Sequence, residues 1–229
     1  MQLKVLSWNI WIDGNFKQLV DFLEAQDADV IGLQEVKDDD TEHPVLAFLQ
    51  NHGYQYVFMP VEKKFKDKVY RDGPAVFSKF PIISSQTHNL SREDNRGAAQ
   101  ADIQVNGKIL HVFSTHFLHT HQKPSKNQDE QADTLFTLLP QAHTIIMGDF
   151  NATPESYPIQ KLSSVLKNTD TSNAPTWSMY PEGCPACSPQ SVDTRLDYIF
   201  VSKDLETTDA KVGKSGASDH LPISVMVEI

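Results

Sequence analysis

Long apolar runs are missing from this 229-residue sequence. No stretch approaches the roughly 20 apolar residues that a membrane-spanning helix requires. The start, MQLKVLSWNIW, has no basic leader followed by an apolar run and a cleavage site. We therefore expect a cytoplasmic protein without a transmembrane segment. Linkers, repeats and low-complexity runs are also missing, which favours one domain over residues 1–229.

Positive charge is scarce. The chain has 30 Asp and Glu residues against 20 Lys and Arg, a net charge of −10. Proteins that bind duplex DNA usually carry a basic face, so the acidic balance argues against that class. It does not exclude nucleic acid as a substrate, because carboxylates that hold a divalent metal also count as negative charge. Basic residues cluster only in Val61–Arg71, which we interpret as a solvated loop or, alternatively, a phosphate-facing loop.

Cysteine is rare, with only Cys184 and Cys187, in PEGCPACSPQ. A complete zinc site would need a second CxxC or a nearby histidine pair, and the sequence has neither there. Two ordinary thiols are the favoured interpretation, with a loop-stapling disulfide or a shared metal as alternatives. A glycine-rich strand-to-helix turn is missing after the first apolar segment, which disfavours a Rossmann layout.

What the sequence does contain is a series of short apolar segments. Alternation or continuous apolar runs predict strands at 4–11, 29–36, 54–61, 74–82, 97–105, 108–117, 144–150, 195–202 and 221–229. Asn106-Gly107 between two of them predicts a two-residue hairpin turn. Helical spacing appears near residues 16–23, 45–49, 127–139 and 158–166. We expect two β-sheets packed face to face with helices outside.

Chemically capable side chains stand at or near the ends of these predicted strands. They are Asn9, Glu35, His116, Asp149, Asn151, Asp197, Asp219 and His220. Each alone has an ordinary explanation, such as a turn residue or a hydrogen-bonded core amide. Two packed sheets could bring all of these ends to one edge, and the sequence then predicts a cleft lined by carboxylates and histidines.

Such a cleft suits a phosphoester and a hard divalent cation. Mg²⁺ takes oxygen ligands, so Glu35 is the first candidate, Asp219 a second contact and Asn9 a neutral oxygen donor. Asp149, with Asn151 beside it, is the candidate base or orienting group for an attacking water. His220 is a candidate donor to a phosphoryl oxygen, with Asp197 holding its ring and raising its pKa.

The sequence resembles the endonuclease/exonuclease/phosphatase superfamily, whose members include deoxyribonuclease I, sphingomyelinases and inositol polyphosphate 5-phosphatases. The resemblance rests on six blocks in order, which are LSWNIW, IGLQEV, STHF, MGDFNATP, RLDYIFVS and SDHLPI. It implies a four-layer α/β/β/α sandwich with two mostly antiparallel sheets. It also implies a metal site at Glu35, Asn9 and Asp219, with Mg²⁺ as cofactor and Mn²⁺ as an alternative.

The same resemblance implies the roles of the remaining residues. Asp149 and Asn151 align or activate the water, and His220 contacts the scissile phosphate with Asp197 as its partner. His116 is a second phosphate-facing histidine, and Arg96, in NRGAAQADI, is a weaker phosphate-binding candidate.

Departures from the patterns of particular subfamilies narrow the range of expected substrates. Abasic-site endonucleases of the exonuclease III type usually carry WNxNG, QETK and a Tyr-containing loop, where this chain has WNIWIDG, QEVK and STHF. The sequence therefore favours the histidine-containing relatives. Any substrate-reading surface must come from short segments such as Val61–Arg71, Leu118–Lys126 and Tyr180–Gln190.

We expect a Mg²⁺-dependent phosphoesterase that cleaves a P–O bond by in-line attack of water. A phosphodiester, for example in nucleic acid, is favoured over a monoester. One alternative is an esterase for phospholipid headgroups, as in sphingomyelinase, or for inositol phosphates. Another is a non-catalytic binding module of the same fold. The sequence leaves the oligomeric state open, with a monomer as the default.

Overall fold

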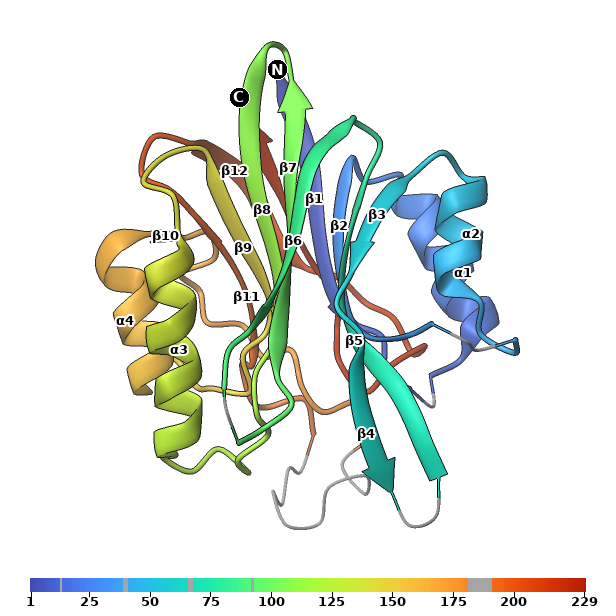
Figure 1. Ribbon diagram of the computed structural model, residues 1–229, viewed down its shortest axis with the longest axis vertical. Coiled ribbons are helices and arrows are strands. Elements are labelled where there is room, and N and C mark those ends of the chain that lie inside the picture. The colour runs from blue at the N-terminus through green and yellow to red at the C-terminus, as the bar shows by residue number, and fades with distance from the viewer. Residues whose placement is uncertain (13, 39–40, 66–67, 92, 181–190) are drawn as a thin grey trace.

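The computed structural model describes residues 1–12, 14–38, 41–65, 68–91, 93–180 and 191–229. The described residues form two mixed β-sheets that pack face to face, with helices on the outer face of each (Figure 1). The four-layer α/β/β/α arrangement expected from the sequence is therefore confirmed. Cys184, Cys187 and most of Tyr180–Gln190 lie outside the described residues.

The first sheet has the strand order β12-β13-β1-β2-β5-β3, with β4 paired to β5. Its strands are β1 (Gln2–Asn9), β2 (Val30–Lys37), β3 (Gln55–Phe58), β4 (Val61–Phe65), β5 (Lys68–Ser78), β12 (Glu206–Val212) and β13 (Ile223–Glu228). Only β1 and β2 run parallel within it.

The second sheet has the order β10-β11-β9-β8-β7-β6. Its strands are β6 (Ile82–Asn89), β7 (Gly97–Val105), β8 (Lys108–His116), β9 (Thr144–Asp149), β10 (Lys167–Asn168) and β11 (Asp197–Val201). Only β8 and β9 are parallel here. Most strand pairs in both sheets are thus antiparallel, as expected.

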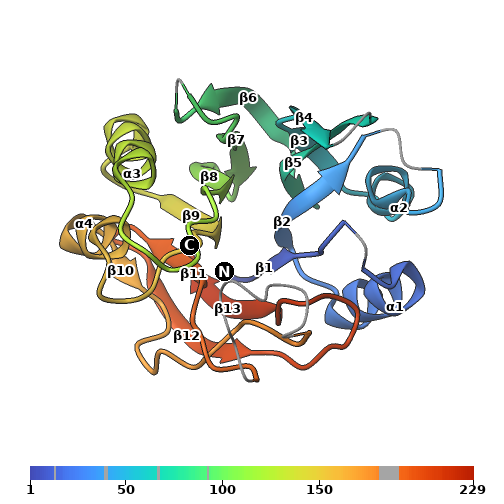
Figure 2. The ribbon, with the colours of Figure 1, turned by 90° about the horizontal axis from the view of Figure 1, so that it is seen from below.

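Helices cover the outer face of each sheet (Figure 2). The first sheet carries α1 (Phe16–Gln26) and α2 (Val45–Asn51), and the second carries α3 (Lys126–Leu138) and α4 (Tyr157–Val165). Asn15 begins α1 by accepting a hydrogen bond from the Gln18 N–H, and Ser125 does the same for α3 with Gln128. Among the described residues, no helix combines the length and the apolar character needed to cross a membrane.

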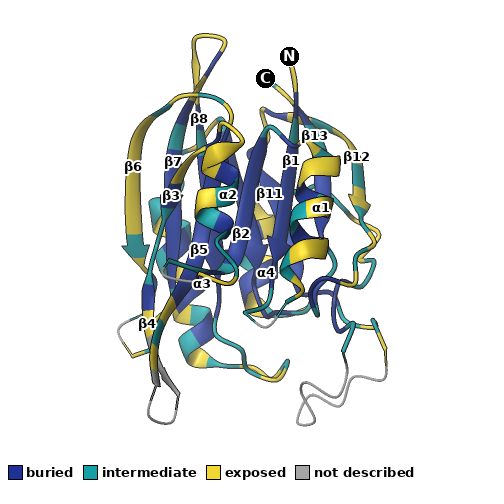
Figure 3. Cartoon of the chain, turned by 90° about the vertical axis from the view of Figure 1, so that its right-hand side faces the viewer, coloured by how far each residue is buried: buried dark blue, intermediate teal, exposed yellow. Residues whose placement is uncertain are grey.

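Apolar side chains form three cores. One lies between the sheets, and the other two lie between each sheet and its helices. Central strands are consequently buried on both faces, as the mainly dark blue β1 and β2 in Figure 3 show, and all six residues of β9 are buried as well. Strands at the edges are different, because β6 and β12 are largely exposed and polar.

These exposed edges explain where the predicted strands were incomplete. The apolar pattern missed β12 and all of β6 beyond Ile82, because neither has a buried face that sequence alternation would reveal. The interpretation of Val61–Arg71 as a loop was wrong, because β4 and the first part of β5 form an antiparallel hairpin there. The turn at Asn106-Gly107 is confirmed, with φ of 50° and 79° between β7 and β8.

The topology brings the polar strand ends to one edge. Parallel neighbours end together, so β1 and β2 deliver Asn9 and Gln34 side by side, and β8 and β9 deliver His116 opposite Asp149. The antiparallel β11 begins where β9 ends, and Asp197 pairs with Asp149. This edge lies at the lower end of the molecule in Figure 1, opposite both termini.

Candidate active site

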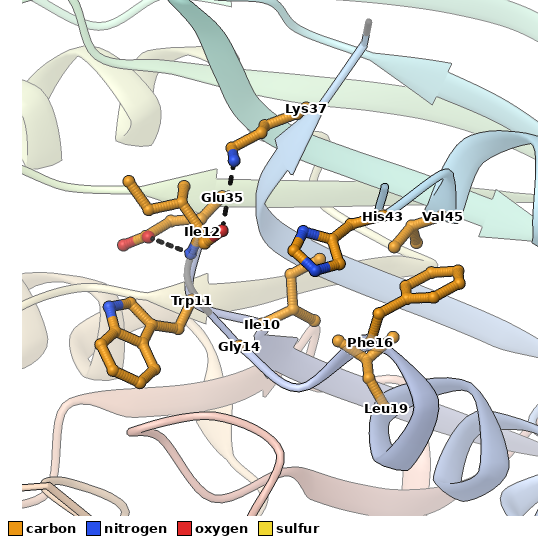
Figure 4. A pocket seen from close by; sticks show the side chains of 10 residues that line it. All are labelled: Ile10, Trp11, Ile12, Gly14, Phe16, Leu19, Glu35, Lys37, His43 and Val45. Atoms are coloured by element: carbon orange, nitrogen blue, oxygen red, sulfur yellow. Dashed lines mark hydrogen bonds between the residues drawn. The ribbon is translucent and has the colours of Figure 1, made fainter. Parts of the chain in front are cut away.

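A β-bulge places the Glu35 carboxylate. The register between β2 and β5 shifts between Leu33 and Val36, and Glu35 has a left-handed φ of 61°. Such a bulge turns a side chain out of the regular alternation. The carboxylate then accepts hydrogen bonds from Asn9 Nδ2 at 3.2 Å and from the Ile12 N–H at 3.1 Å, the latter drawn in Figure 4. Lys37 Nζ donates to the Ile12 carbonyl at 3.2 Å and supports the same loop.

Asp149 is the centre of the site. Its side chain is buried, and its Oδ1 accepts from the Asn151 N–H at 2.8 Å. Its Oδ2 accepts from Asn9 Nδ2 at 3.0 Å and from Asn151 Nδ2 at 3.2 Å. His116 Nε2 and His220 Nε2 lie 3.4 and 3.6 Å from the same oxygen. One carboxylate thus contacts four polar side chains from four separate segments of the chain.

His220 is held by Asp197. Its Nδ1 lies 2.9 Å from Asp197 Oδ2, so the Nε2 atom faces Asp149. The Thr176 hydroxyl donates to the same Asp197 oxygen at 2.6 Å and accepts from the Leu196 and Asp197 N–H groups. Asp197 Oδ1 is buried without a hydrogen-bond partner. The predicted carboxylate–histidine pair is therefore present as a geometric arrangement.

Burial and the charges around them shift the pKa values of Asp149 and His220. Burial raises the pKa of Asp149 to about 7, and the Asp197 carboxylate adds to the rise, while His220 opposes it. For His220, burial alone would lower the pKa, but the carboxylates of Asp197, Asp149 and Asp219 outweigh burial and raise it well above its ordinary value. At neutral pH the histidine is therefore a charged donor beside Asp149.

The donor set fits a divalent cation. Glu35, Asp149 and Asp219 line the same cleft and offer the carboxylate oxygens that hard cations prefer. Asp149, Asp197 and His220 form a second, buried group whose ligand atoms lie within 4.8 Å of one another, and a metal ion could bind there only with His220 deprotonated. Asn9 is a weaker candidate ligand than the carboxylates. Its Oδ1 already accepts a hydrogen bond from the Trp11 N–H at 3.0 Å, and its amide nitrogen points to Glu35 and Asp149.

The structure brings all nine predicted site residues together. Two of them, Asn9 and Asp197, are buried beneath the surface of the cleft. The other predicted residues line the cleft, namely Glu35, Arg96, His116, Asp149, Asn151, Asp219 and His220. Asp219 accepts from Trp177 Nε1 at 3.1 Å. The roles assigned to these residues stay predictions.

Seven further residues line the cleft, which are Trp11, Ile12, His119, His121, Trp177, Ser178 and Tyr180. Sequence reasoning covered His119, His121 and Tyr180 only as parts of candidate substrate-reading segments and missed the other four. His119 Nδ1 lies 2.8 Å from Asn151 Oδ1, so an N–H there donates to the amide oxygen and fixes its orientation. Burial lowers the pKa of His119, which keeps its ring neutral at pH 7. The repeated histidines of STHFLHTH were the available signal for this part of the wall.

Solved structures share the fold. An endonuclease/exonuclease/phosphatase from Beutenbergia cavernae matches 100% of this chain and 72% of its own, with a TM-score of 0.81 at 19% identity. The human Nocturnin catalytic domain with bound sulfate matches 99% of this chain and 94% of its own, with a TM-score of 0.73 at 21% identity. A mannosyl-6-phosphatase of Bacteroides thetaiotaomicron matches 99% of this chain and 100% of its own, with a TM-score of 0.71 at 19% identity.

Among curated proteins, none matches this sequence significantly. The model of the Endonuclease/Exonuclease/phosphatase family, in contrast, matches residues 6–220, which contain every candidate site residue described above. The chain therefore belongs to the endonuclease/exonuclease/phosphatase family.

Proposed function

We propose that this protein is a divalent-metal-dependent phosphoesterase that hydrolyses a P–O bond by in-line attack of water. The observation that carries the proposal is the buried Asp149 carboxylate, which has Asn9, Asn151, His116 and His220 around it in a family of phosphoester hydrolases. A carboxylate with a raised pKa beside a charged histidine is a base and an acid in one site.

Each residue has a task in this proposal. Asp149, oriented by Asn151, positions and deprotonates the attacking water. His220, charged and held by Asp197, donates to a phosphoryl oxygen on which negative charge develops, and His116 is a second donor. Arg96 is a further contact for the phosphate at the cleft wall.

Glu35 and Asp219 would hold the metal, with Asn9 bridging Glu35 and Asp149 through its amide. A bound Mg²⁺ or Mn²⁺ supplies Lewis-acid stabilisation of charge on the phosphoryl group. The protein's own contribution is to hold the water, the donors and the phosphate in line.

The finer choices stay predictions. The sequence favours a phosphodiester, for example in nucleic acid, over a monoester, and the lipid-headgroup or inositol-phosphate esterase is the alternative. We also propose that residues 1–229 act as one catalytic domain in the cytoplasm.

The test is hydrolysis by the whole chain with Mg²⁺ or Mn²⁺, comparing wild type with Asp149→Asn and His220→Ala. Each substitution should lower kcat by about 10²–10⁴, because a base or an oxyanion donor each contributes that much. Asp102→Asn and His111→Ala are matched controls, since this pair joins β7 and β8 away from the cleft. Near-normal turnover by either site variant would refute the assigned roles, and the absence of specific divalent binding in calorimetry would favour a non-catalytic module.

A further inference from the structure

The cleft wall beside the catalytic residues is aromatic and rigid. Trp11 and Tyr180 stack with ring centroids 5.4 Å apart and an interplanar angle of 30°. The Tyr180 hydroxyl donates to the Gly216 carbonyl at 2.6 Å, and Trp177 Nε1 donates to Asp219. These contacts fix three rings of the wall in place within the protein itself. None of the tasks in the proposed hydrolysis uses them.

Trp11 is tied directly to the candidate metal site. Its backbone N–H donates to Asn9 Oδ1 at 3.0 Å, and the Asn9 amide in turn contacts Glu35 and Asp149. Figure 4 shows that the Trp11 indole and the Glu35 carboxylate point to the same side, away from Phe16 and His43. An aromatic surface therefore stands next to the position of the reacting phosphate.

The charge of the cleft does not suit a long polyanion. Arg96 is the one Lys or Arg among the described residues that line it, whereas Glu35, Asp149 and Asp219 are acidic. Polynucleotide binding relies on several basic contacts to successive phosphates. Outside the cleft, Arg71 of β5 is engaged in an ion pair with Asp38 at 2.9 Å.

The size of the cleft also points to a small ligand. Its volume is about 310 Å³, at the low end of the roughly 300–1,000 Å³ of small-molecule sites. Hydrogen-bonding imidazoles line it as well, since His119 Nε2 and His121 Nδ1 lie 3.2 Å apart next to Asn151. Imidazoles of this kind both donate to and accept from hydroxyl groups.

Resting on the proposed function, we infer that the substrate is a compact phosphoester whose ring, a sugar or a nucleoside, lies against Trp11 while its phosphate lies beside Asp149 and His220. The aromatic wall provides the ring contact, the exposed imidazole of His121 contacts hydroxyl groups, and the single arginine matches a single phosphate. A compact ester therefore takes the place of the nucleic acid that the sequence favoured, because the described lining has one basic residue against three acidic ones.

The experiment measures kcat/KM with Mg²⁺ for five kinds of substrate. Glucose 6-phosphate and AMP distinguish a sugar from a nucleoside, the dinucleoside phosphate ApA is a compact diester, and glycerol 3-phosphate lacks a ring. A single-stranded 20-mer DNA represents the polynucleotide. At least one compact ring-bearing substrate should exceed both glycerol 3-phosphate and the 20-mer by about tenfold or more, the size expected of one stacked ring.

Variants test the ring contact. Trp11→Ala should lower the ratio of kcat/KM between the best ring-bearing substrate and glycerol 3-phosphate by about tenfold, and Trp11→Phe should retain most of it. Tyr56→Ala, which removes an exposed ring on β3 outside the cleft, should leave the ratio unchanged.

Two results would overturn the inference. One is a 20-mer hydrolysed as well as or better than every compact substrate, and the other is a ratio that Trp11→Ala does not alter. If that 20-mer cleavage disappears in Asp149→Asn, the proposed function stands and only the inference about the substrate fails. If wild type hydrolyses none of the five with Mg²⁺ or Mn²⁺, or if Asp149→Asn equals wild type, both fail.

Discussion

At the scale of single residues, hydrogen bonds hold the candidate catalytic groups in place. Asp197 orients His220, and Thr176 in turn orients Asp197 through a 2.6 Å hydrogen bond. Thr176 also satisfies two buried backbone N–H groups at the start of β11. A side chain that contacts no substrate in the proposed function thus determines where the His220 donor points.

Replacing Thr176 tests this dependence. Thr176→Val removes one donor to a carboxylate and the acceptor for two buried N–H groups, and each unsatisfied buried group costs about 1–3 kcal/mol. We expect lower stability in urea unfolding together with a kcat reduced by about tenfold, the value of one hydrogen bond to a charged group. Thr176→Ser keeps the hydroxyl and should restore both quantities. A Val variant that is destabilised but has wild-type kcat would show that Thr176 supports only the fold.

At the scale of secondary-structure elements, the two parallel strand pairs build the site. The β8–β9 pair requires close backbone approach next to the candidate catalytic carboxylate, because Gly148 precedes Asp149 with φ of 154°. A Cβ atom at Gly148 would lie 2.0 Å from the Thr115 carbonyl oxygen. Only glycine allows β9 to end there beside His116 of β8.

Gly148→Ala should therefore lower the free energy of unfolding by about 3 kcal/mol, the upper end for overpacked sites, and reduce activity as Asp149 moves. Gly32→Ala is the matched control on the opposing sheet. A Cβ there would meet only the Met147 side chain at 2.7 Å, which is flexible, so a cost nearer about 1 kcal/mol is expected. Chemical denaturation measures both, and an equal cost for the two substitutions would contradict the backbone-contact explanation.

At the scale of the whole molecule, stability and function have separate sources. Three apolar cores hold the four layers together, whereas three carboxylates crowd one cleft in a protein of net charge −10. A cation in the cleft would offset that local repulsion, but the cores do not depend on it.

Removal of the metal should consequently abolish activity while the fold stays intact. With EDTA we expect an unchanged far-ultraviolet circular dichroism spectrum and no phosphoester hydrolysis, which added Mg²⁺ or Mn²⁺ restores. Metal at about 100 times its Kd should stabilise the wild type by about 2.7 kcal/mol, which raises Tm. Glu35→Gln should show a smaller rise, and an equal rise in that variant would place the metal elsewhere.

Much of the architecture follows from local sequence patterns. The central strands and the four helices were predicted because each leaves an apolar signal in the sequence. Burial on both faces gives a strand a continuous apolar run, as in Thr144–Asp149, and burial of one face gives a helix a periodic pattern, as in Phe16–Gln26. The residues Glu35, Asp149, Asp219 and His220 were identifiable because they stand in sequence blocks that, taken in order, resemble one family, whereas each residue alone has an ordinary explanation.

The tertiary structure decided the rest. Polar edge strands such as β6 and β12 are held by neighbouring strands and not by a buried face, so their sequences carry no apolar period. The left-handed Glu35 in its bulge, and the stacking of Trp11 on Tyr180, depend on contacts between segments far apart in the chain. The sequence by itself determined the layers and most of the chemical groups. Strand register and loop packing determined which groups meet in the cleft, because those contacts exist only once the two sheets are paired.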